Sequence, residues 1–232
     1  MLSVYTIEKK RKKSDDDSIF ESLEINSLKW KKIENINLNL SYTILFTKKQ
    51  ADNIFGQLEK DIKYFSNDLL KVKVFGKWHE IPRKQVAYGD SGLTYSFSGT
   101  TIPALPWTDL ISNLRQVIVS VTGISFNFVL VNRYKNGLDH IGEHQDNEKE
   151  LEEKAPIASL SFGQVRDFVL KHKESRGKNV KCKIDPVKIE LEHGSLLMMN
   201  YPTNLYWYHS LPIRKKCIHP RVNLTFRKFK VK

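Results

Sequence analysis

The sequence predicts an α+β protein that is mainly β, and two observations lead to this fold class. From residue 124 onward, short runs rich in Val, Ile, Leu and Phe alternate with Gly, Pro or Asn turns, a spacing typical of a β-sandwich or barrel. Before residue 124, two stretches place apolar residues at helical spacing. With 232 residues, the chain is long enough to bury a substantial core. The strands predicted after residue 124 are 126–131, 157–162, 168–171, 187–191, 195–199 and 222–229.

Both predicted helices have recognisable ends. The first follows a short strand at 41–46 and begins after Thr47, which forms a capping-box pattern with Gln50. The second begins near Thr108 and ends at Gly123, a residue suited to the left-handed conformation found at helix C-termini. Each helix carries an apolar stripe, so each is expected to pack against the core.

Between the two helices lies a predicted hairpin flanked by lysines. Residues 71–74 alternate polar and apolar, Gly76 permits a tight turn, and Trp78 begins the returning strand. Phe75 at the tip allows two interpretations. It can fold back onto the core, which the residues alone favour, or it can act as an apolar wedge of the kind that separates stacked bases.

The charge balance favours a polyanionic partner. Lys and Arg outnumber Asp and Glu by 38 to 26, which gives a net charge of +12, and 11% of the residues are aromatic and able to stack on bases. Residues 1–25 are interpreted as a tail whose basic cluster at 9–13 is a nuclear-localisation signal, a nucleic-acid arm or plain solvated chain. There is no apolar run near the roughly 20 residues of a membrane span, no signal-peptide core and no Cys-x-x-Cys pair. We therefore expect an intracellular, reduced protein without a membrane partner.

Candidate metal ligands lie in the stretch NRYKNGLDHIGEHQD. His144 and Asp146 are two residues apart, and on extended chain side chains at i and i+2 share a face. An imidazole and a carboxylate then point at the same spot, as a metal ion requires. The pair alone can arise by chance in a chain with seven His. Other polar residues in strand-like segments are His209, in NLYWYHSLP, and the alternating pair Asn132 and Tyr134.

Polar residues also alternate along the last predicted strand. In RVNLTFR, one face carries four polar side chains and the other carries three apolar ones. Two arginines on the inward face of a barrel would be unpaired buried charges, each costing several kcal/mol. The pattern is satisfied if this face meets a dianion. The four polar residues are Arg221, Asn223, Thr225 and Arg227.

The two His, the Asp and the arginine-bearing strand together resemble the AlkB family of Fe(II)/2-oxoglutarate dioxygenases. In that family a two-His, one-carboxylate triad leaves open positions on non-haem iron. The similarity spans residues 72–228 and is high with a vertebrate member that reverses alkylation damage in duplex DNA. The matching segments are VFGKWHEIPRKQ, YGDSGLTYSFSG, FNFVLVNRYKNGLDHIGEHQD, PIASLSFGQVRDFVLKHK, HGSLLMMNYPTNLYWYHSLP and PRVNLTFRK.

The resemblance implies a double-stranded β-helix, or jelly roll, with supporting helices. It divides the chain into the tail at 1–25, an N-terminal extension at 26–123 with a nucleotide-recognition hairpin or lid, and a catalytic core at 124–232 that forms one structural domain with the extension. The implied activity is oxidative demethylation of 1-methyladenine and 3-methylcytosine in double-stranded DNA, with release of formaldehyde. It requires Fe(II), 2-oxoglutarate and molecular oxygen. We also expect a monomer that works in the nucleus.

The resemblance also assigns residues to the metal and to the co-substrate. His144, Asp146 and His209 would ligate Fe(II). Arg221 would hold the distal carboxylate of 2-oxoglutarate, and Arg227 would lie nearer the metal. The other residues implied in holding 2-oxoglutarate are Asn132, Tyr134, Asn223 and Thr225.

DNA contacts follow from the same resemblance. A methyl group on a base-pairing nitrogen is hidden in a duplex, so the base must be flipped out. The residue matching Phe75 fills the gap left in the stack, which reverses the interpretation favoured above, and the flipped base would stack between Phe97 and His144. Asn147 stands where the vertebrate protein has an Asp that contacts the exocyclic amino group, so the preferred lesion is left open. The remaining implied contacts are Gly76, Lys77, Arg83, Gln85, Tyr95, Ser96 and Glu148 around the lesion, and Lys171, Arg176, Lys178, Arg214, Lys215 and Lys216 on phosphates.

Three other functions are weighed against this one. The same chemistry could act on RNA or single strands, although a single strand offers no stack for Phe75 to enter. A DNA-binding protein that has lost catalysis would show a broken triad or a missing arginine, and the sequence shows neither. A protein or small-molecule hydroxylase would not need base-stacking aromatics or basic loops.

Overall fold

The computed structural model describes residues 27–66, 71–74, 76–97, 100–176, 180 and 182–230, with the backbone alone at 72–74, 97 and 100. The predicted tail at 1–25, Phe75 and Lys178 lie outside the described residues, as does the side chain of Phe97. None of the helices in the described part of the chain has the length and apolar character needed to cross a bilayer.

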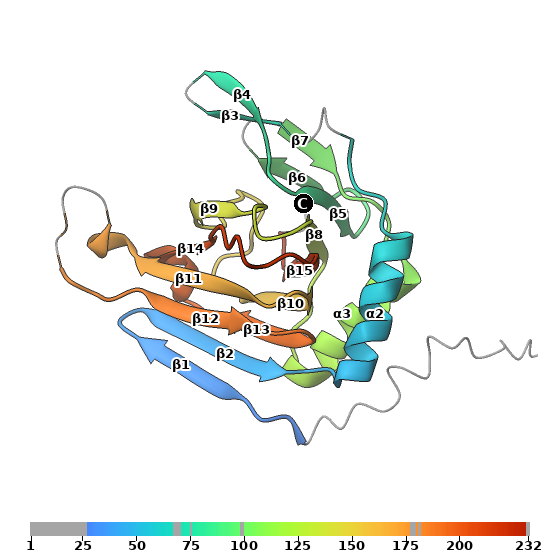
Figure 1. The fold of residues 1–232 in the computed structure, drawn as a ribbon, viewed down its shortest axis with the longest axis horizontal. Coiled ribbons are helices and arrows are strands. Elements are labelled where there is room, and N and C mark those ends of the chain that lie inside the picture. The colour runs from blue at the N-terminus through green and yellow to red at the C-terminus, as the bar shows by residue number, and fades with distance from the viewer. Residues whose placement is uncertain are drawn as a thin grey trace, which may run out of the picture.

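Two antiparallel sheets form the body of the molecule (Figure 1). They pack against each other through a shared apolar cluster that includes Leu40 and Leu197 of the larger sheet and Leu170 and Trp207 of the smaller one. The larger sheet has the strand order β1 (Lys31–Asn35), β2 (Leu38–Ile44), β13 (Ser195–Met199), β10 (Ile157–Gly163), β15 (Arg221–Arg227), β8 (Phe128–Tyr134) and β5 (Lys84–Gly89). The smaller sheet has the order β12 (Val187–Leu191), β11 (Arg166–His172), β14 (Trp207–Leu211) and β9 (Ile141–His144).

The path of the chain through these sheets confirms the predicted jelly roll. Strands β8, β10, β13 and β15 lie in the larger sheet, and β9, β11, β12 and β14 lie in the smaller one, so the chain passes repeatedly from one sheet to the other. The N-terminal strands β1, β2 and β5 extend the larger sheet at both ends.

Most of the core strands occur where the sequence predicts them. Strands β12 and β13 span the predicted residues, and the other predicted core strands differ at their ends by at most three residues. Among the strands that were not predicted are β1 (KKIEN) and β9 (IGEH). Both are largely exposed and carry a single Ile each, so neither has the apolar alternation that identifies a half-buried strand.

The two predicted helices are α2 (Lys48–Asp61) and α3 (Asp109–Thr122), and their ends are confirmed. Thr47 accepts the backbone N–H of Gln50, and the Gln50 side chain accepts the N–H of Thr47, which completes the capping box. Gly123 ends α3 in the left-handed region at φ 71°. Two shorter helical turns follow later, η3 (Lys173–Ser175) and α4 (Thr203–Tyr206).

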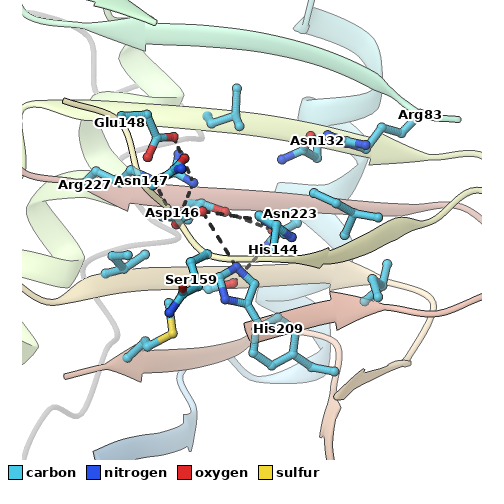
Figure 2. A pocket seen from close by; sticks show the side chains of 18 of the residues that line it. Arg83, Asn132, His144, Asp146, Asn147, Glu148, Ser159, His209, Asn223 and Arg227 are labelled. Carbon is cyan, nitrogen blue, oxygen red and sulfur yellow. Dashed lines mark hydrogen bonds and ion pairs between the residues drawn. The ribbon is translucent and has the colours of Figure 1, made fainter. Parts of the chain in front are cut away.

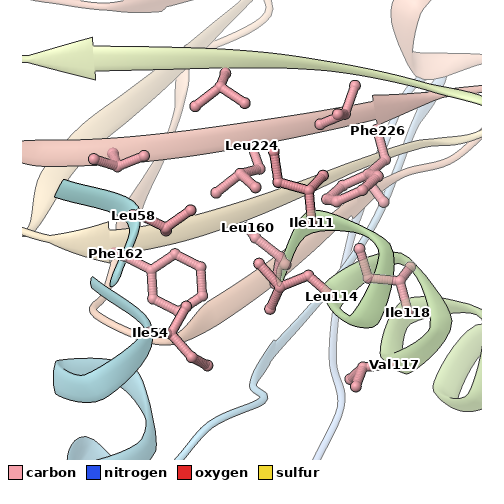
Figure 3. Close-up of a cluster of buried hydrophobic side chains, with 14 of the residues drawn as sticks. Ile54, Leu58, Ile111, Leu114, Val117, Ile118, Leu160, Phe162, Leu224 and Phe226 are labelled. Atoms are coloured by element: carbon pink, nitrogen blue, oxygen red, sulfur yellow. The ribbon is translucent and has the colours of Figure 1, made fainter. Parts of the chain in front are cut away.

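Both long helices cover the outer face of the larger sheet (Figures 1 and 3). On β15, the side chains of Val222, Leu224 and Phe226 point into this interface, where they are completely buried. Truncating Leu224 to Ala would cost roughly 2–5 kcal/mol because it leaves a cavity among these side chains. The helices contribute Ile54, Leu58, Ile111, Leu114 and Ile118, and β10 contributes Leu160 and Phe162. This packing leaves the other face of β15 free to line the space between the sheets.

A hairpin of β3 (Lys71–Val74) and β4 (Lys77–Glu80) projects from the body of the molecule (Figure 1). Gly76 in its turn has φ 80°, as the predicted tight turn requires. Every residue of β4 is exposed, including Trp78, of which 58% is accessible. A second small hairpin, β6 (Thr94–Phe97) and β7 (Thr100–Pro103), lies between it and the sheets (Figure 1). The β3–β4 hairpin is therefore presented to an outside partner rather than to the core.

Candidate active site

A cavity of about 940 Å³ opens between the two sheets. Its walls come from the inner faces of β8, β10 and β15 on one side and of β9, β11 and β14 on the other. The alternation predicted along β15 is confirmed, because its four polar residues line this cavity while its apolar residues face the helices. These four are Arg221, Asn223, Thr225 and Arg227.

The three candidate metal ligands meet in this cavity (Figure 2). His144 ends β9 and is paired with His209 on β14, and Asp146 follows two residues after β9. One ligand atom from each residue lies within 4.8 Å of the other two. Asp146 Oδ1 is 3.7 Å from the Nε2 atom of each His. The strand pairing thus brings together residues that are far apart in the sequence.

The imidazole of His144 has the protonation state that a metal requires. Its Nδ1 atom is 2.9 Å from the carbonyl oxygen of Gly142, to which it donates, and this leaves the lone pair on Nε2. Burial, together with the neighbouring His209, lowers the pKa of His144 from 6.5 to about 4. The ring is therefore neutral near pH 7, as a metal ligand must be.

Asp146 is held in place by two neighbours. Its Oδ2 atom accepts from Arg227 Nε at 3.1 Å and Nη2 at 2.8 Å, which leaves Oδ1 directed at the two imidazoles. Burial works against the charge, but Arg227 holds the pKa of Asp146 well below its usual range. Asn204 of α4 fixes the backbone, since its Oδ1 accepts the Asp146 N–H at 3.0 Å and its Nδ2 donates to the Asp146 carbonyl at 2.6 Å. The carboxylate is thus oriented before any metal binds.

Arg221 lies elsewhere in the cavity with its charge unpaired. It is 2% exposed and donates from Nη2 to Ser161 Oγ at 2.9 Å, and within the described part of the chain it makes no ion pair and its Nε has no partner. Burial lowers its pKa from 12.5 to about 10. The ring centre of Tyr134 is 5.4 Å from its guanidinium carbon. An unpaired buried cation is costly, so the site is suited to an anionic ligand.

Further polar residues line the same wall. Thr225 donates to Asn223 Oδ1 at 3.1 Å, and Asn223 Nδ2 donates to Ser159 Oγ at 2.8 Å. On the neighbouring strand, Asn132 Oδ1 accepts from Arg83 Nε at 2.9 Å (Figure 2). The structure therefore brings together all six residues that the sequence assigns to the co-substrate around one cavity.

Residues 40–227 match the 2OG-Fe(II) oxygenase superfamily. The chain belongs to this superfamily. Proteins named DNA oxidative demethylase ALKBH2 are 58% identical over 87% of this chain and 72% of the Bos taurus protein, and 58% identical over 86% of this chain and 76% of the Homo sapiens protein. A Bos taurus protein named alpha-ketoglutarate-dependent dioxygenase alkB homolog 3 is 36% identical over 77% of this chain and 62% of its own length. The solved structure of OsALKBH1 shares the fold, with a TM-score of 0.54 over 84% of this chain and 99% of that chain at 16% identity.

Membership in the 2OG-Fe(II) oxygenases implies Fe(II), 2-oxoglutarate and oxygen, and the residues of the cavity fit this set. Two imidazoles and one carboxylate form the ligand set of non-haem iron oxygenases. The unpaired guanidinium of Arg221 fits one carboxylate of a dianionic co-substrate. Arg227 lies next to a metal ligand, which agrees with its expected position nearer the metal.

One predicted DNA contact of this oxygenase differs in the structure. Gln85 lies on β5 opposite Asn132 of β8, its side chain is 0% exposed, and neither side-chain polar atom has a partner among the described residues. Gln85 lies on β5, the strand at one edge of the larger sheet, and its side chain is directed inward, so in this structure it is not at the protein surface. Arg83, two residues earlier, remains at the cavity mouth.

The residues expected to contact a flipped base surround the metal ligands of the oxygenase. Tyr95 is buried and stacks on Phe128 with 5.7 Å between the ring centres. Ser96 Oγ lies 3.0 Å from Thr101 Oγ1. Asn147 is exposed at the cavity rim, whereas Glu148 points inward with its Oε1 atom 3.8 Å from an arginine of β15. Burial raises the pKa of Glu148.

The basic residues expected on phosphates differ in their partners. Glu143 binds both Lys171, at 2.5 Å, and Arg176, at 2.8 Å, so their charges are partly neutralised. Arg214 pairs with an aspartate of β11. Lys215 and Lys216 are exposed just after β14, and Lys77 is exposed on the β3–β4 hairpin. These three have the least hindered access to a polyanion.

Two residues that support the site were not identified from the sequence. Asn204 orients Asp146 through its backbone, and Arg166 is buried with its guanidinium donating to three backbone carbonyls, of residues 136, 139 and 212. Both roles depend on loops that meet only in the folded chain. No local pattern marks them.

Proposed function

We propose that this protein is a DNA-repair dioxygenase that demethylates N-alkylated bases, such as 1-methyladenine and 3-methylcytosine, in double-stranded DNA and releases formaldehyde. The observation that carries the proposal is the intact triad in the same cavity as a buried arginine that has no acidic partner among the described residues. It occurs in a chain 58% identical to proteins named DNA oxidative demethylase. A protein that had lost catalysis would have no reason to keep a cation buried without a partner.

The residues of the chain have separate tasks in this reaction. Bound Fe(II), 2-oxoglutarate and oxygen together supply the oxidation of the methyl group, which then leaves as formaldehyde. His144, His209 and the Oδ1 atom of Asp146 would hold the metal, while Arg227 binds the second carboxylate oxygen of Asp146. Arg221 would hold the distal carboxylate of 2-oxoglutarate. The sheets enclose the reacting atoms and limit water.

The methylated base would enter between Tyr95 and the metal ligands after flipping out of the duplex. Glu148 is the acidic group that reaches into the cavity beside this position, whereas Asn147 is exposed at the rim. An amide can accept a hydrogen bond from an exocyclic amino group, but it carries no charge and can also present a donor. We propose that Glu148 supplies the negative charge facing the base.

The test is release of formaldehyde and restoration of the unmodified base from 1-methyladenine in matched duplex and single-stranded oligonucleotides. Turnover on duplex that is lost in His144→Ala supports the proposal. The Phe75→Ala variant should lose more activity on duplex than on single strands, because only a duplex has a stack to fill. Turnover on single strands alone would favour the alternative substrate, RNA or single-stranded nucleic acid. No turnover on either, with metal and 2-oxoglutarate bound, would overturn the substrate assignment.

We further propose that the protein is a monomer and works in the nucleus. The basic cluster at 9–13 supports nuclear import, because short Lys/Arg-rich runs are typical import signals. Light scattering at micromolar concentration tests the first point. A fluorescent protein fused to residues 1–25, with and without the lysines of the cluster, tests the second, and equal distribution of the two fusions would refute it.

A further inference from the structure

A second group of metal-ligating side chains lies outside the active site, where the chain leaves β11. A ring nitrogen of His172, a carboxylate oxygen of Glu174 and the sulfur of Cys182 lie within 4.8 Å of one another. We propose that these three residues form a second metal site, which takes a borderline divalent ion such as Zn²⁺. Imidazole, carboxylate and thiolate are the ligands that zinc uses in proteins, whereas Mg²⁺ and Ca²⁺ prefer oxygen ligands alone.

The backbone holds the two sides of this cluster together without a metal. Cys182 N donates to the carbonyl of Glu174 at 3.5 Å. Ser175 Oγ donates to the carbonyl of Cys182 at 2.9 Å and accepts the N–H of Ile184 at 2.8 Å. The η3 turn is thereby fixed against the segment before β12. The ligands are brought together by the fold, and a metal would not have to close a long loop by itself.

The distances fit a tetrahedral ion after a small adjustment. Zinc bonds of about 2.0–2.3 Å place neighbouring ligand atoms roughly 3.3–3.8 Å apart. Cys182 Sγ already lies 3.6 Å from Glu174 Oε2. Bringing the third ligand atom from within 4.8 Å to this range requires a movement of about 1 Å, which side-chain rotation can supply. Three protein ligands leave the fourth position to water.

His172 is a ligand whose direction is already set. It is 1% exposed, and its ring lies against Trp207 at 5.3 Å and Tyr206 at 6.0 Å between ring centres. Its Nε2 atom has no partner among the described residues, and Nδ1 accepts only the backbone N–H of Glu174, at 3.3 Å. Because Nδ1 accepts, the proton of the neutral ring lies on Nε2; a metal would bind at Nδ1 in place of this one long hydrogen bond, or at Nε2 after the proton moves to Nδ1. The fixed orientation of the ring reduces the entropy lost on binding.

Metal binding at this cluster requires no reactant other than the ion. The thiol of Cys182 loses its proton to solvent as the sulfur–metal bond forms, and Glu174 binds as a carboxylate. Two anionic ligands then neutralise the dication, while neutral His172 completes the protein ligands. The active site has no thiolate and one carboxylate, so the two sites differ in the ions they prefer.

The position of the cluster suggests that the metal would position Arg176 beside the active site, an inference that rests on the proposed function. Arg176 follows η3, lies 3.6 Å over the ring of Tyr208 and pairs with Glu143 at 2.8 Å. Tyr208 and Glu143 each directly precede a metal ligand of the active site. A metal bound two residues before Arg176 would therefore hold this arginine at the edge of the active site, where a phosphate of the DNA backbone would pass.

The experiment is a titration of the full chain with Co²⁺, followed by competition with Zn²⁺. Cobalt bound to a thiolate gives a charge-transfer absorption band in the near ultraviolet, and the active site cannot give this band because it has no sulfur ligand. We expect the band in the wild type, its loss in Cys182→Ser and its retention in Cys217→Ser, which alters the other cysteine. Glu174→Gln keeps the shape of the side chain and should weaken Co²⁺ binding at least tenfold. Zinc should displace cobalt and remove the band.

Several outcomes would overturn the proposal. These are a wild type without the band, a band that persists in Cys182→Ser, or a band that is lost in Cys217→Ser. Circular dichroism of each variant distinguishes lost binding from lost folding, and Glu174→Gln gives a second measurement at an unchanged thiol. Because the readout depends on sulfur ligation, its result is independent of demethylase activity. A failed activity test and a failed cobalt test therefore refute different statements.

Discussion

Replacing Arg221 with Met tests whether the cavity is built around an unpaired positive charge. Burial lowers the pKa of this guanidinium from 12.5 to about 10. At about 1.4 kcal/mol per pKa unit, the buried charge destabilises the ligand-free protein by roughly 3 kcal/mol. The substitution removes this cost and leaves Ser161 Oγ without its donor, a loss of about 1 kcal/mol. We expect the ligand-free Arg221→Met protein to be about 2 kcal/mol more stable than the wild type.

The expected gain in stability of Arg221→Met does not depend on the pH near neutrality. A guanidinium with a depressed pKa binds its proton less tightly in the folded state, so the penalty is fully present below about pH 10 and falls as the pH rises through that value. Measurements at pH 7 therefore capture all of it. For a chain of this length, about 2 kcal/mol corresponds to an increase in Tm of roughly 4–8 °C.

The same substitution should remove the stabilisation that 2-oxoglutarate gives. At one hundred times its Kd, a ligand stabilises the folded state by about 2.7 kcal/mol. Loss of the guanidinium partner should raise the Kd at least about 30-fold, which reduces this stabilisation below about 1 kcal/mol at the same concentration. The assay is urea unfolding with and without 2-oxoglutarate, with Mn²⁺ in place of Fe(II) to prevent turnover.

Arg166→Met is the matched control, because Arg166 is equally buried but donates to three backbone carbonyls. The same change there should destabilise the protein, since it leaves buried acceptors without partners. If Arg221→Met is less stable than the wild type, or if it keeps the full shift with 2-oxoglutarate, the reasoning about Arg221 is refuted.

Three further predictions concern the surroundings of the site. Asn204→Ala should weaken Mn²⁺ binding by roughly 10–100-fold, measured by titration, because Asn204 orients the backbone of Asp146 without touching the metal. Gly56→Ala, at an exposed position of helix α2, should stabilise the protein by up to about 1 kcal/mol, whereas Gly137→Ala should destabilise it strongly in the same urea assay, because a Cβ there overlaps a backbone carbonyl of the loop after β14. Lys216→Ala should lower the salt dependence of duplex binding by about one unit of slope, and an unchanged slope would remove this exposed lysine from the interface.

Local patterns in the sequence were sufficient for much of the fold. The capping box at Thr47 and the stop at Gly123 depend on residues within one turn, so propensity alone predicts them. The two faces of β15 follow from alternation, which requires only that one face is buried. Gln85 was predicted to contact DNA around the lesion, and the structure shows it buried; the sequence could not indicate this burial, because it depends on β5 joining β8 from a distant part of the chain. Strand β9 has no apolar pattern that could predict it, and its position in the smaller sheet depends on its pairing with β14.

The sequence could not show that the two arginines on one face of β15 differ in their ionic partners. Both Arg221 and Arg227 are fully buried, yet Arg227 is paired with Asp146 and its pKa is raised, while Arg221 has no acidic partner among the described residues and its pKa is lowered. A dicarboxylate that enters the cavity therefore finds one neutralised arginine beside the metal ligands and one available arginine away from them. We therefore expect 2-oxoglutarate to bind in one orientation, with one carboxylate on Arg221 and the other end at the metal. Removing the carboxylate charge with Asp146→Asn would free Arg227 and leave two competing cations, so we expect 2-oxoglutarate to lose its single orientation.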